Sequence, residues 1–166
     1  LGEALRRAGR FSFDTETNSL NAQSAELIGM SFAWGDNQCA YVPLRHDDGE
    51  QVEWHRFISE LGPILADQDI KKFGQNLKYD ITVFRQNGLA VDGVDGDTLL
   101  LDYVLAAHSR RHGLDDLEQR HLGHSMVSYA EVSDGERLKF NEIDIESAAT
   151  YAAEDALVTH LVEQKL

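Results

Sequence analysis

Acidic side chains recur at spacings that would bring carboxylates together. Asp14 and Glu16 are two positions apart. Asp14 ends a segment, residues 10–14, in which apolar side chains alternate, and Glu16 lies just beyond it. Because side chains at i and i+2 of a strand point to the same face, both carboxylates are expected on one side of a sheet. Neighbouring carboxylates repel each other unless a cation lies between them. The pair indicates a divalent metal site, although Asp-x-Glu alone is a weak signal in a chain with 29 acidic residues.

Two further acids have a polar partner four residues earlier. Asn76 precedes Asp80 at this spacing, and Tyr151 precedes Asp155. Residues i and i+4 lie on one face of a helix, so each pair would share a surface. Simpler interpretations exist, because Asn76 could be an N-cap with Asp80 favouring the helix dipole, and Tyr151 could be a surface tyrosine beside an acid. Glu154 is expected on a different face of its helix.

Short apolar runs in the first half of the chain are typical of β-strands. Strands are expected at residues 10–14, 27–34, 39–44 and 70–73. Gly35-Asp36-Asn37 separates the second run from the third and predicts a hairpin. Gly74 ends the fourth run.

Helical spacing of apolar residues predicts the remaining elements. Helices are expected at residues 1–8, 52–65, 76–86, 97–107, 115–122 and from 144 onward. Asn76, Asp97 and Asp144 are the predicted N-caps, and Asp115 with Glu118 has the spacing of a capping box. The alanines of the last helix would let it approach a sheet closely. Three strands, then alternating helices and strands, then helices predict an α/β fold with a mixed sheet between helices.

Length and composition are those of one ordinary globular domain. The chain has 166 residues, of which 42% are hydrophobic and only two are proline. It has no run of about 18 apolar residues and no basic-then-apolar leader, so no membrane span and no secretory signal are expected. The single cysteine, Cys39, allows no internal disulfide and fits a reducing compartment such as the cytoplasm.

The net charge of −14 leaves several interpretations open. A nucleic-acid-binding domain usually carries a basic patch, so this charge alone argues against one. It is compatible with solubility or with a basic partner. It is also compatible with an acidic centre that binds divalent cations, which then bind phosphate. Composition does not choose among these.

Three motifs in order carry a resemblance to a known family. FDTETNSL, GQNLKYD and YAAED resemble the three exonuclease motifs of the DEDD superfamily. They are most similar to the 3′→5′ proofreading exonuclease domain of bacterial DNA polymerase I, family A, and Tyr151 is typical of the tyrosine branch. The similarity extends from about Phe11 to the end of the chain and includes DTLLLDYVL and LKFNEI. It implies a ribonuclease-H-like sheet, with three antiparallel strands followed by parallel strands, in one domain of residues 1–166 excised from a longer polymerase.

The same resemblance implies a two-metal centre. Asp14, Glu16, Asp80 and Asp155 would hold two divalent ions, Mg²⁺ or Mn²⁺, with Asp14 as the bridging ligand. Glu16 and Asp155 would complete the metal on the nucleophile side, and Asp80 would serve the other through water. Such ions lie roughly 3.5–4 Å apart, where one generates the nucleophile and the other stabilises the leaving 3′ oxygen. Tyr151, whose ordinary pKa is near 10, would stay neutral and orient the attacking water.

Substrate contacts are also implied by the resemblance. The positions that resemble DNA-contacting residues are Leu20, Gln75, Asn76, Tyr79, Arg111 and Tyr129. Tyr129 stands where the family has a different aromatic ring, so that stacking on a base would be preserved. Candidate cations for guiding a strand are Lys72, Lys78, Arg110 and Arg111.

The expected function is removal of nucleoside 5′-monophosphates from single-stranded or frayed DNA 3′ ends, as proofreading in replication and repair. The expected partner is the polymerase domain of the same chain, in the bacterial cytoplasm, with the isolated domain monomeric. One alternative is an RNA-trimming exonuclease of the same superfamily, because the four acids do not distinguish the two substrates. Another is a non-catalytic domain that braces a polymerase, which the retention of all four acids disfavours. An unrelated acidic interaction module is a third alternative, without specific support.

Overall fold

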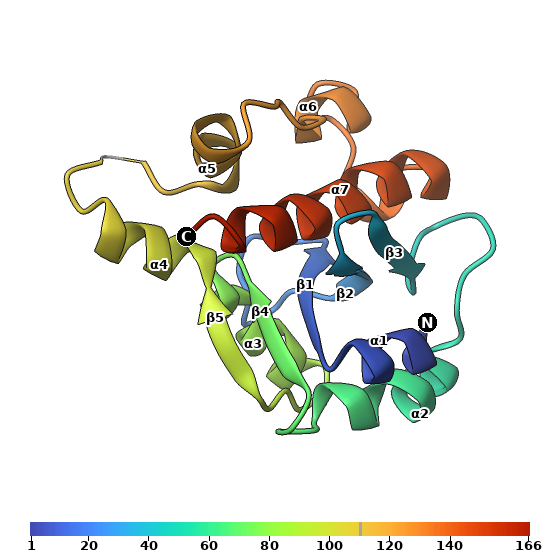
Figure 1. Ribbon diagram of the computed structural model, residues 1–166. Coiled ribbons are helices and arrows are strands. Elements are labelled where there is room, and N and C mark those ends of the chain that lie inside the picture. Colours follow the sequence, from blue (N-terminus) through green and yellow to red (C-terminus); the bar gives the residue numbers. More distant parts are fainter. Residues whose placement is uncertain (110) are drawn as a thin grey trace.

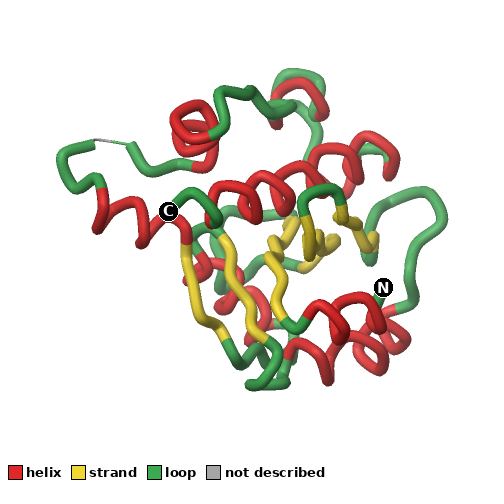
Figure 2. The backbone as a smooth tube through the Cα atoms, in the orientation of Figure 1, coloured by secondary structure: helices red, strands yellow, loops and turns green. Residues whose placement is uncertain are grey.

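A five-stranded sheet with helices on both faces organises the computed structural model, which describes residues 1–109 and 111–166 (Figure 1 and Figure 2). The strands are β1 Arg10–Thr17, β2 Leu27–Gly35, β3 Gln38–Pro43, β4 Lys71–Gly74 and β5 Val94–Asp97. The helices are α1 Gly2–Ala8, α2 Trp54–Leu65, α3 Leu77–Gln86, α4 Thr98–Leu105, α5 Leu114–His121, α6 Tyr129–Val132, the 3₁₀ helix η1 Phe140–Glu142 and α7 Ile145–Glu163.

The sheet has the strand order β3-β2-β1-β4-β5. β2 runs antiparallel to both β1 and β3, whereas β4 runs parallel to both β1 and β5. The predicted mixed sheet, three antiparallel strands followed by parallel ones, is therefore confirmed. β1 lies at its centre, so the acids of this strand are placed in the middle of the molecule.

The two faces of β1 contact different helices. The Ser12 hydroxyl donates a hydrogen bond of 2.8 Å to the carbonyl oxygen of Ala156 in α7. The Phe13 ring stacks on Phe84 of α3, with 5.4 Å between ring centroids. Since side chains alternate along a strand, the even-numbered residues of β1 face α7 and the odd-numbered ones face α3. Both acids of β1 consequently lie on the α7 face.

Small residues let α7 pack directly on the sheet. Ala148, Ala152 and Ala156 are completely buried, which confirms the predicted close approach of this helix. Asp144 caps the helix as predicted, because its carboxylate accepts a 2.9 Å hydrogen bond from the Ser147 amide. α5 and α6 pack on α7 on the side away from the sheet (Figure 1).

One aspartate caps two helices, which corrects one predicted cap. Asp97 caps α4 as expected, by accepting from the Leu99 amide at 3.0 Å. Its two carboxylate oxygens also accept from the amides of Asn76 at 3.0 Å and Leu77 at 2.9 Å, at the start of α3. Asn76 occupies the N-cap position of α3 but makes no capping bond with its side chain, because its backbone is left-handed, with φ 58° and ψ 42°.

The predicted capping box at Asp115 and Glu118 is wrong. Gly113 is the N-cap of α5, so both acids lie inside the helix. Glu118 is only 1% exposed, and its carboxylate accepts from the His124 ring at 2.6 Å and from the Met126 amide at 2.9 Å. Its function in the fold is to hold the loop after α5, where two donors satisfy its buried oxygens.

Three elements, β5, α6 and η1, have no counterpart among the expected ones, and one helix is shorter than expected. β5 has the sequence Val-Asp-Gly-Asp, which lacks apolar alternation, and it forms because its backbone pairs with β4. α6 is a single turn, and α4 ends at Leu105 rather than near residue 107. Among the residues described, no helix is long and apolar enough to cross a membrane.

Candidate active site

Three carboxylates converge where β1 faces α7. One oxygen from each of Asp14, Glu16 and Asp155 lies within 4.8 Å of the others. β1 supplies the first two from its α7 face, and α7 supplies Asp155 next to the buried Ala156. The close packing of α7 on the sheet is what carries the third acid to the other two. The structure thus brings together three of the four acids identified from the sequence.

The electrostatics of this group favour a cation. Burial, together with the charge of Asp155, raises the pKa of Asp14 to about 8, and burial raises the pKa of Asp155 to about 7. Burial and the neighbouring acids hold the pKa of Glu16 well above its usual range. The Glu16 Oε1 atom is buried and has no hydrogen-bond partner among the described residues. A divalent ion would replace repulsion by attraction and would use this oxygen as a ligand, so the donor set fits Mg²⁺ or Mn²⁺.

Asp80 reaches the group from the opposite side of the sheet. It lies in the first turn of α3, is only 2% exposed, and its Oδ1 accepts hydrogen bonds from the Thr15 amide at 3.1 Å and the Thr15 hydroxyl at 2.5 Å. Burial and the charge of Asp14 hold its pKa well above the usual range. Asp80 is therefore a neighbour of Asp14 but not a member of the compact group of three.

Tyr151 lies one helical turn before Asp155 on α7. Its ring is half-buried between Tyr129 and Phe140, with 6.1 Å between centroids in each pair. Burial and the charge of Asp155 raise the pKa of the Tyr151 phenol far above its ordinary value. The hydroxyl is consequently neutral at physiological pH and can orient a bound molecule but cannot act as a base.

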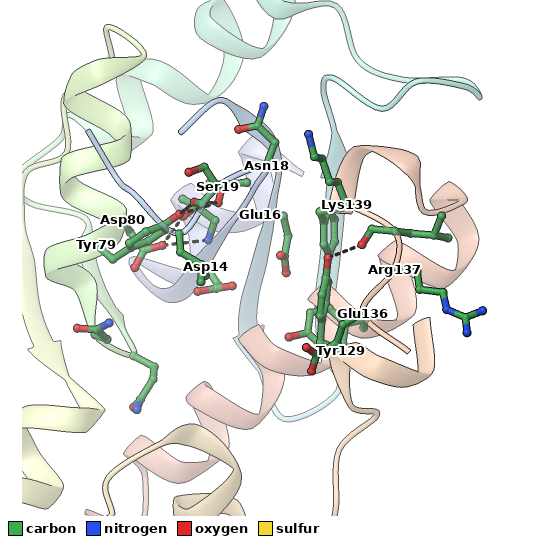
Figure 3. A pocket seen from close by; sticks show the side chains of 18 residues that line it. Asp14, Glu16, Asn18, Ser19, Tyr79, Asp80, Tyr129, Glu136, Arg137 and Lys139 are labelled. Atoms are coloured by element: carbon green, nitrogen blue, oxygen red, sulfur yellow. Dashed lines mark hydrogen bonds between the residues drawn. The ribbon is translucent and has the colours of Figure 1, made fainter. Parts of the chain in front are cut away.

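A cavity of about 780 Å³ opens over the acids (Figure 3). Besides Asp14, Glu16, Asp80 and Tyr151, its lining includes five of the six predicted substrate-binding residues, namely Leu20, Gln75, Asn76, Tyr79 and Tyr129. The Leu20 side chain is 98% exposed at its rim. The Tyr79 hydroxyl donates to the Ser19 carbonyl at 2.5 Å, which fixes this ring in the wall. The arrangement can accommodate a short stretch of extended polymer above a set of cation ligands.

Comparison with known proteins identifies the family. A family model described as 3′–5′ exonuclease matches residues 1–166. The chain belongs to this 3′–5′ exonuclease family. It is 40% identical over 169 residues to DNA polymerase I of Pseudomonas aeruginosa, an alignment that covers 98% of the chain and 18% of that relative. The exonuclease chain therefore corresponds to less than a fifth of the length of this relative.

Solved structures share the fold of the exonuclease chain. Brucella melitensis NrnC with bound Mg²⁺ superposes with a TM-score of 0.69 at 21% identity, covering 95% of this chain and 73% of that one. Escherichia coli RNase D superposes with a TM-score of 0.72 at 19% identity, covering 99% of this chain and 40% of that one. The ribonuclease-H-like fold expected from the motifs is thereby confirmed.

The cations that were expected to guide a nucleic-acid strand differ from one another in their exposure in the exonuclease structure. Arg111 does not line the cavity, and its side chain is 81% exposed. The prediction that Lys72 guides a strand is wrong, because this lysine is completely buried and its ammonium donates to the Asp67 carbonyl at 2.5 Å. Lys78 is exposed on α3, and Arg110 lies outside the described residues.

The cavity also contains residues that sequence reasoning missed. Arg137, Lys139 and Phe140 line it from the side opposite β1. Phe140 is 3% exposed and stacks on Tyr129, with the two ring planes 12° apart. The signal that would have found Lys139 and Phe140 is LKFNEI, a stretch that resembles the family but contains no acid ligand.

Proposed function

We propose that the chain is a two-metal 3′→5′ exodeoxyribonuclease domain that releases nucleoside 5′-monophosphates from single-stranded or frayed DNA 3′ ends. The observation that carries the proposal is the convergence of Asp14, Glu16 and Asp155 within 4.8 Å, with Asp80 beside them, under a cavity of about 780 Å³. Membership of the 3′–5′ exonuclease family supplies the direction of cleavage. The DNA polymerase I relatives support DNA as the substrate.

The proposed cofactors are two divalent ions, Mg²⁺ or Mn²⁺. Asp14, Glu16 and Asp155 would hold one of them, and Asp14 with Asp80 would hold the other. When bound, these ions supply a hydroxide-like nucleophile at neutral pH and stabilise the leaving 3′ oxygen. The fold neighbour NrnC, described with bound Mg²⁺, supports the choice of ion.

The side chains of the site have separate roles in this proposal. The neutral Tyr151 hydroxyl holds the attacking water by a hydrogen bond, because its raised pKa keeps the proton on the phenol. Glu16, through the carboxylate oxygen that does not hold the ion, is the group that can accept a proton from that water. Asp14 would serve only as a ligand, shared between the two ions.

The proposed substrate contacts are made by residues that line the cavity. Leu20 at the rim and Tyr129 in the wall present apolar and aromatic surfaces that grip bases without sequence preference. The lining residues Gln75, Asn76 and Tyr79 would contact the terminal nucleotide. Arg111, being exposed beyond the cavity, would contact a strand outside it.

The wider setting is also a proposal. Because the chain matches 18% of a DNA polymerase I, the remainder of such a polypeptide would be its partner and proofreading in replication and repair its role. The proposed location is the bacterial cytoplasm, and the isolated domain is expected to be monomeric.

The test uses 5′-labelled single-stranded DNA and RNA of the same sequence, incubated with Mn²⁺. We expect a ladder of DNA products shortened from the 3′ end, and a slower reaction on RNA. Asp155→Asn should abolish the ladder, whereas Glu146→Gln, an exposed acid on the same helix, should leave it intact. Internal cuts or shortening from the 5′ end would contradict the polarity, and faster cleavage of RNA would favour the RNA-trimming alternative.

A further inference from the structure

One segment of the cavity wall, residues 133–139, has an unusual backbone. Asp134, Gly135 and Glu136 are all left-handed, with φ of 51°, 70° and 65°. Residues other than glycine rarely adopt this conformation, so the surrounding contacts must hold it. The hydroxyl of Ser133, which is completely buried, accepts a 3.0 Å hydrogen bond from the Glu136 amide and closes the turn.

Hydrogen bonds at both ends fix this segment to the rest of the site. The Ser133 hydroxyl donates to the Tyr129 carbonyl at 2.7 Å, and the Tyr129 phenol donates to the Leu138 carbonyl at 2.9 Å. The Lys139 amide donates to the Glu142 carboxylate at 2.7 Å. The distance between Tyr129 and Lys139 is therefore fixed, because the Tyr129 hydroxyl is hydrogen-bonded to Leu138, the residue before Lys139.

Lys139 differs from the neighbouring cation in its surroundings. Arg137 and Lys139 are the two cations among the described residues that line the cavity, whose lining also contains four acids. Arg137 extends away from the acids and pairs with Asp134 at 3.4 Å, whereas Lys139 extends toward the side of the opening where Asn18 lies (Figure 3). Within residues 1–109 and 111–166, no carboxylate pairs with the Lys139 ammonium.

We propose that Lys139 binds a backbone phosphate of the single strand on the 5′ side of the scissile bond and so positions the 3′ end over the acids. This inference rests on the proposed function. A chain with a net charge of −14 repels DNA, so an unpaired cation at the rim has a large effect on the approach of a strand. The hydrogen-bonded link to Tyr129 would set the distance between a stacked base and the neighbouring phosphate.

The test compares two substrates and three variants. Oligothymidylate carries upstream phosphates, whereas thymidine 5′-(p-nitrophenyl) phosphate carries only the scissile one. We expect Lys139→Gln to raise the KM for the oligonucleotide several-fold with little change in kcat, and to affect the aryl ester much less. The dependence of log(kcat/KM) on log salt should flatten by about 0.7, the value for one single-strand phosphate contact. Lys139→Arg should restore both quantities.

Lys71→Gln is the matched control, because this exposed lysine lies at the start of β4, at the end of the sheet away from the acids. There its backbone is paired with that of Arg10 at the start of β1. The proposal is overturned if Lys139→Gln leaves the KM and salt dependence unchanged, if Lys71→Gln has the same effect, or if the aryl ester loses as much activity as the oligonucleotide. If the wild type cleaves neither substrate, the proposed function fails. Lys139 is then tested by fluorescence anisotropy of a labelled strand with Ca²⁺, where an unchanged affinity in Lys139→Gln overturns the proposal.

Discussion

Thr15 holds Asp80 with two donors, its amide at 3.1 Å and its hydroxyl at 2.5 Å from the same carboxylate oxygen. Because Thr15 stands between Asp14 and Glu16, one stretch of three residues in β1 presents two acids to one face of the sheet and fixes a third acid from the other. The middle residue of Asp-Thr-Glu thus connects α3 to the group of acids under α7.

We expect Thr15→Val to lower kcat/KM about tenfold or more, because a hydrogen bond to a charged group contributes roughly 1.5–3 kcal/mol. Thr15→Ser keeps the hydroxyl and should retain most activity. Steady-state cleavage of a labelled oligonucleotide measures both variants. Equal activity in Thr15→Val and the wild type would mean that the Thr15 hydroxyl has no part in placing Asp80.

Tyr151→Phe should retain partial activity. The phenol is neutral, since burial and Asp155 raise its pKa, so its removal deletes one hydrogen bond to the attacking water and no proton acceptor. The loss should appear in kcat rather than in KM, measured on single-stranded DNA. Full activity in this variant would remove Tyr151 from the mechanism.

Gly29 is opposite Glu16 in the sheet, and a Cβ atom at this position would overlap the Tyr41 hydroxyl. That hydroxyl bonds to the His46 ring at 2.7 Å, so Gly29→Ala must displace a packed side chain. We expect a loss of about 1–3 kcal/mol in the free energy of unfolding, measured by thermal denaturation. Gly62→Ala is the control, because its added Cβ makes only an ordinary contact of 3.8 Å. Equal stability of the two variants would contradict the close approach of Tyr41.

The metal-free protein should lose stability as the pH rises. Asp14 and Asp155 have folded pKa values of about 8 and 7, whereas unfolded aspartate titrates near 3.9, so the folded state binds more protons. Their contribution is complete below about pH 4 and is lost as the pH rises through about 7 to 8. Thermal denaturation in EDTA should therefore show a falling Tm, and a smaller fall in Asp14→Asn. An identical fall in both would assign the effect to general repulsion in this acidic chain.

Local patterns predicted the elements that depend on local physics. The alternation around Phe11 and Phe13 predicted β1, the alanines predicted the close packing of α7, and Asp144 was predicted as its cap. The structure also brings Asp14, Glu16 and Asp155 together as the motifs indicated, because each lies on a regular element whose periodicity fixes the direction of its side chain.

The errors concern features that depend on contacts which no periodic pattern of residues indicates. Asp97 caps α3 from another element, which no pattern around Asn76 indicates. Lys72 is buried because its ammonium finds the Asp67 carbonyl, although lysine is ordinarily a surface residue. Lys139 was missed because LKFNEI contains no acid ligand, and because a left-handed turn in the preceding residues brings this lysine to the cavity.

The central claim, that the acids form a divalent metal centre, is tested most directly by the effect of Mn²⁺ on the Tm of the wild type and of Asp14→Ala. An ion that binds only the folded state stabilises it by roughly 2.7 kcal/mol at a hundredfold excess over Kd. For a domain of this size each kcal/mol raises the Tm by about 2–4 °C.

We therefore expect Mn²⁺ to raise the wild-type Tm by several degrees beyond a monovalent salt control at matched ionic strength, which accounts for general screening. Asp14→Ala should fold, as judged by circular dichroism, and should show no such rise. Equal shifts in the two proteins would mean that Mn²⁺ acts diffusely on the acidic surface and would contradict the metal centre.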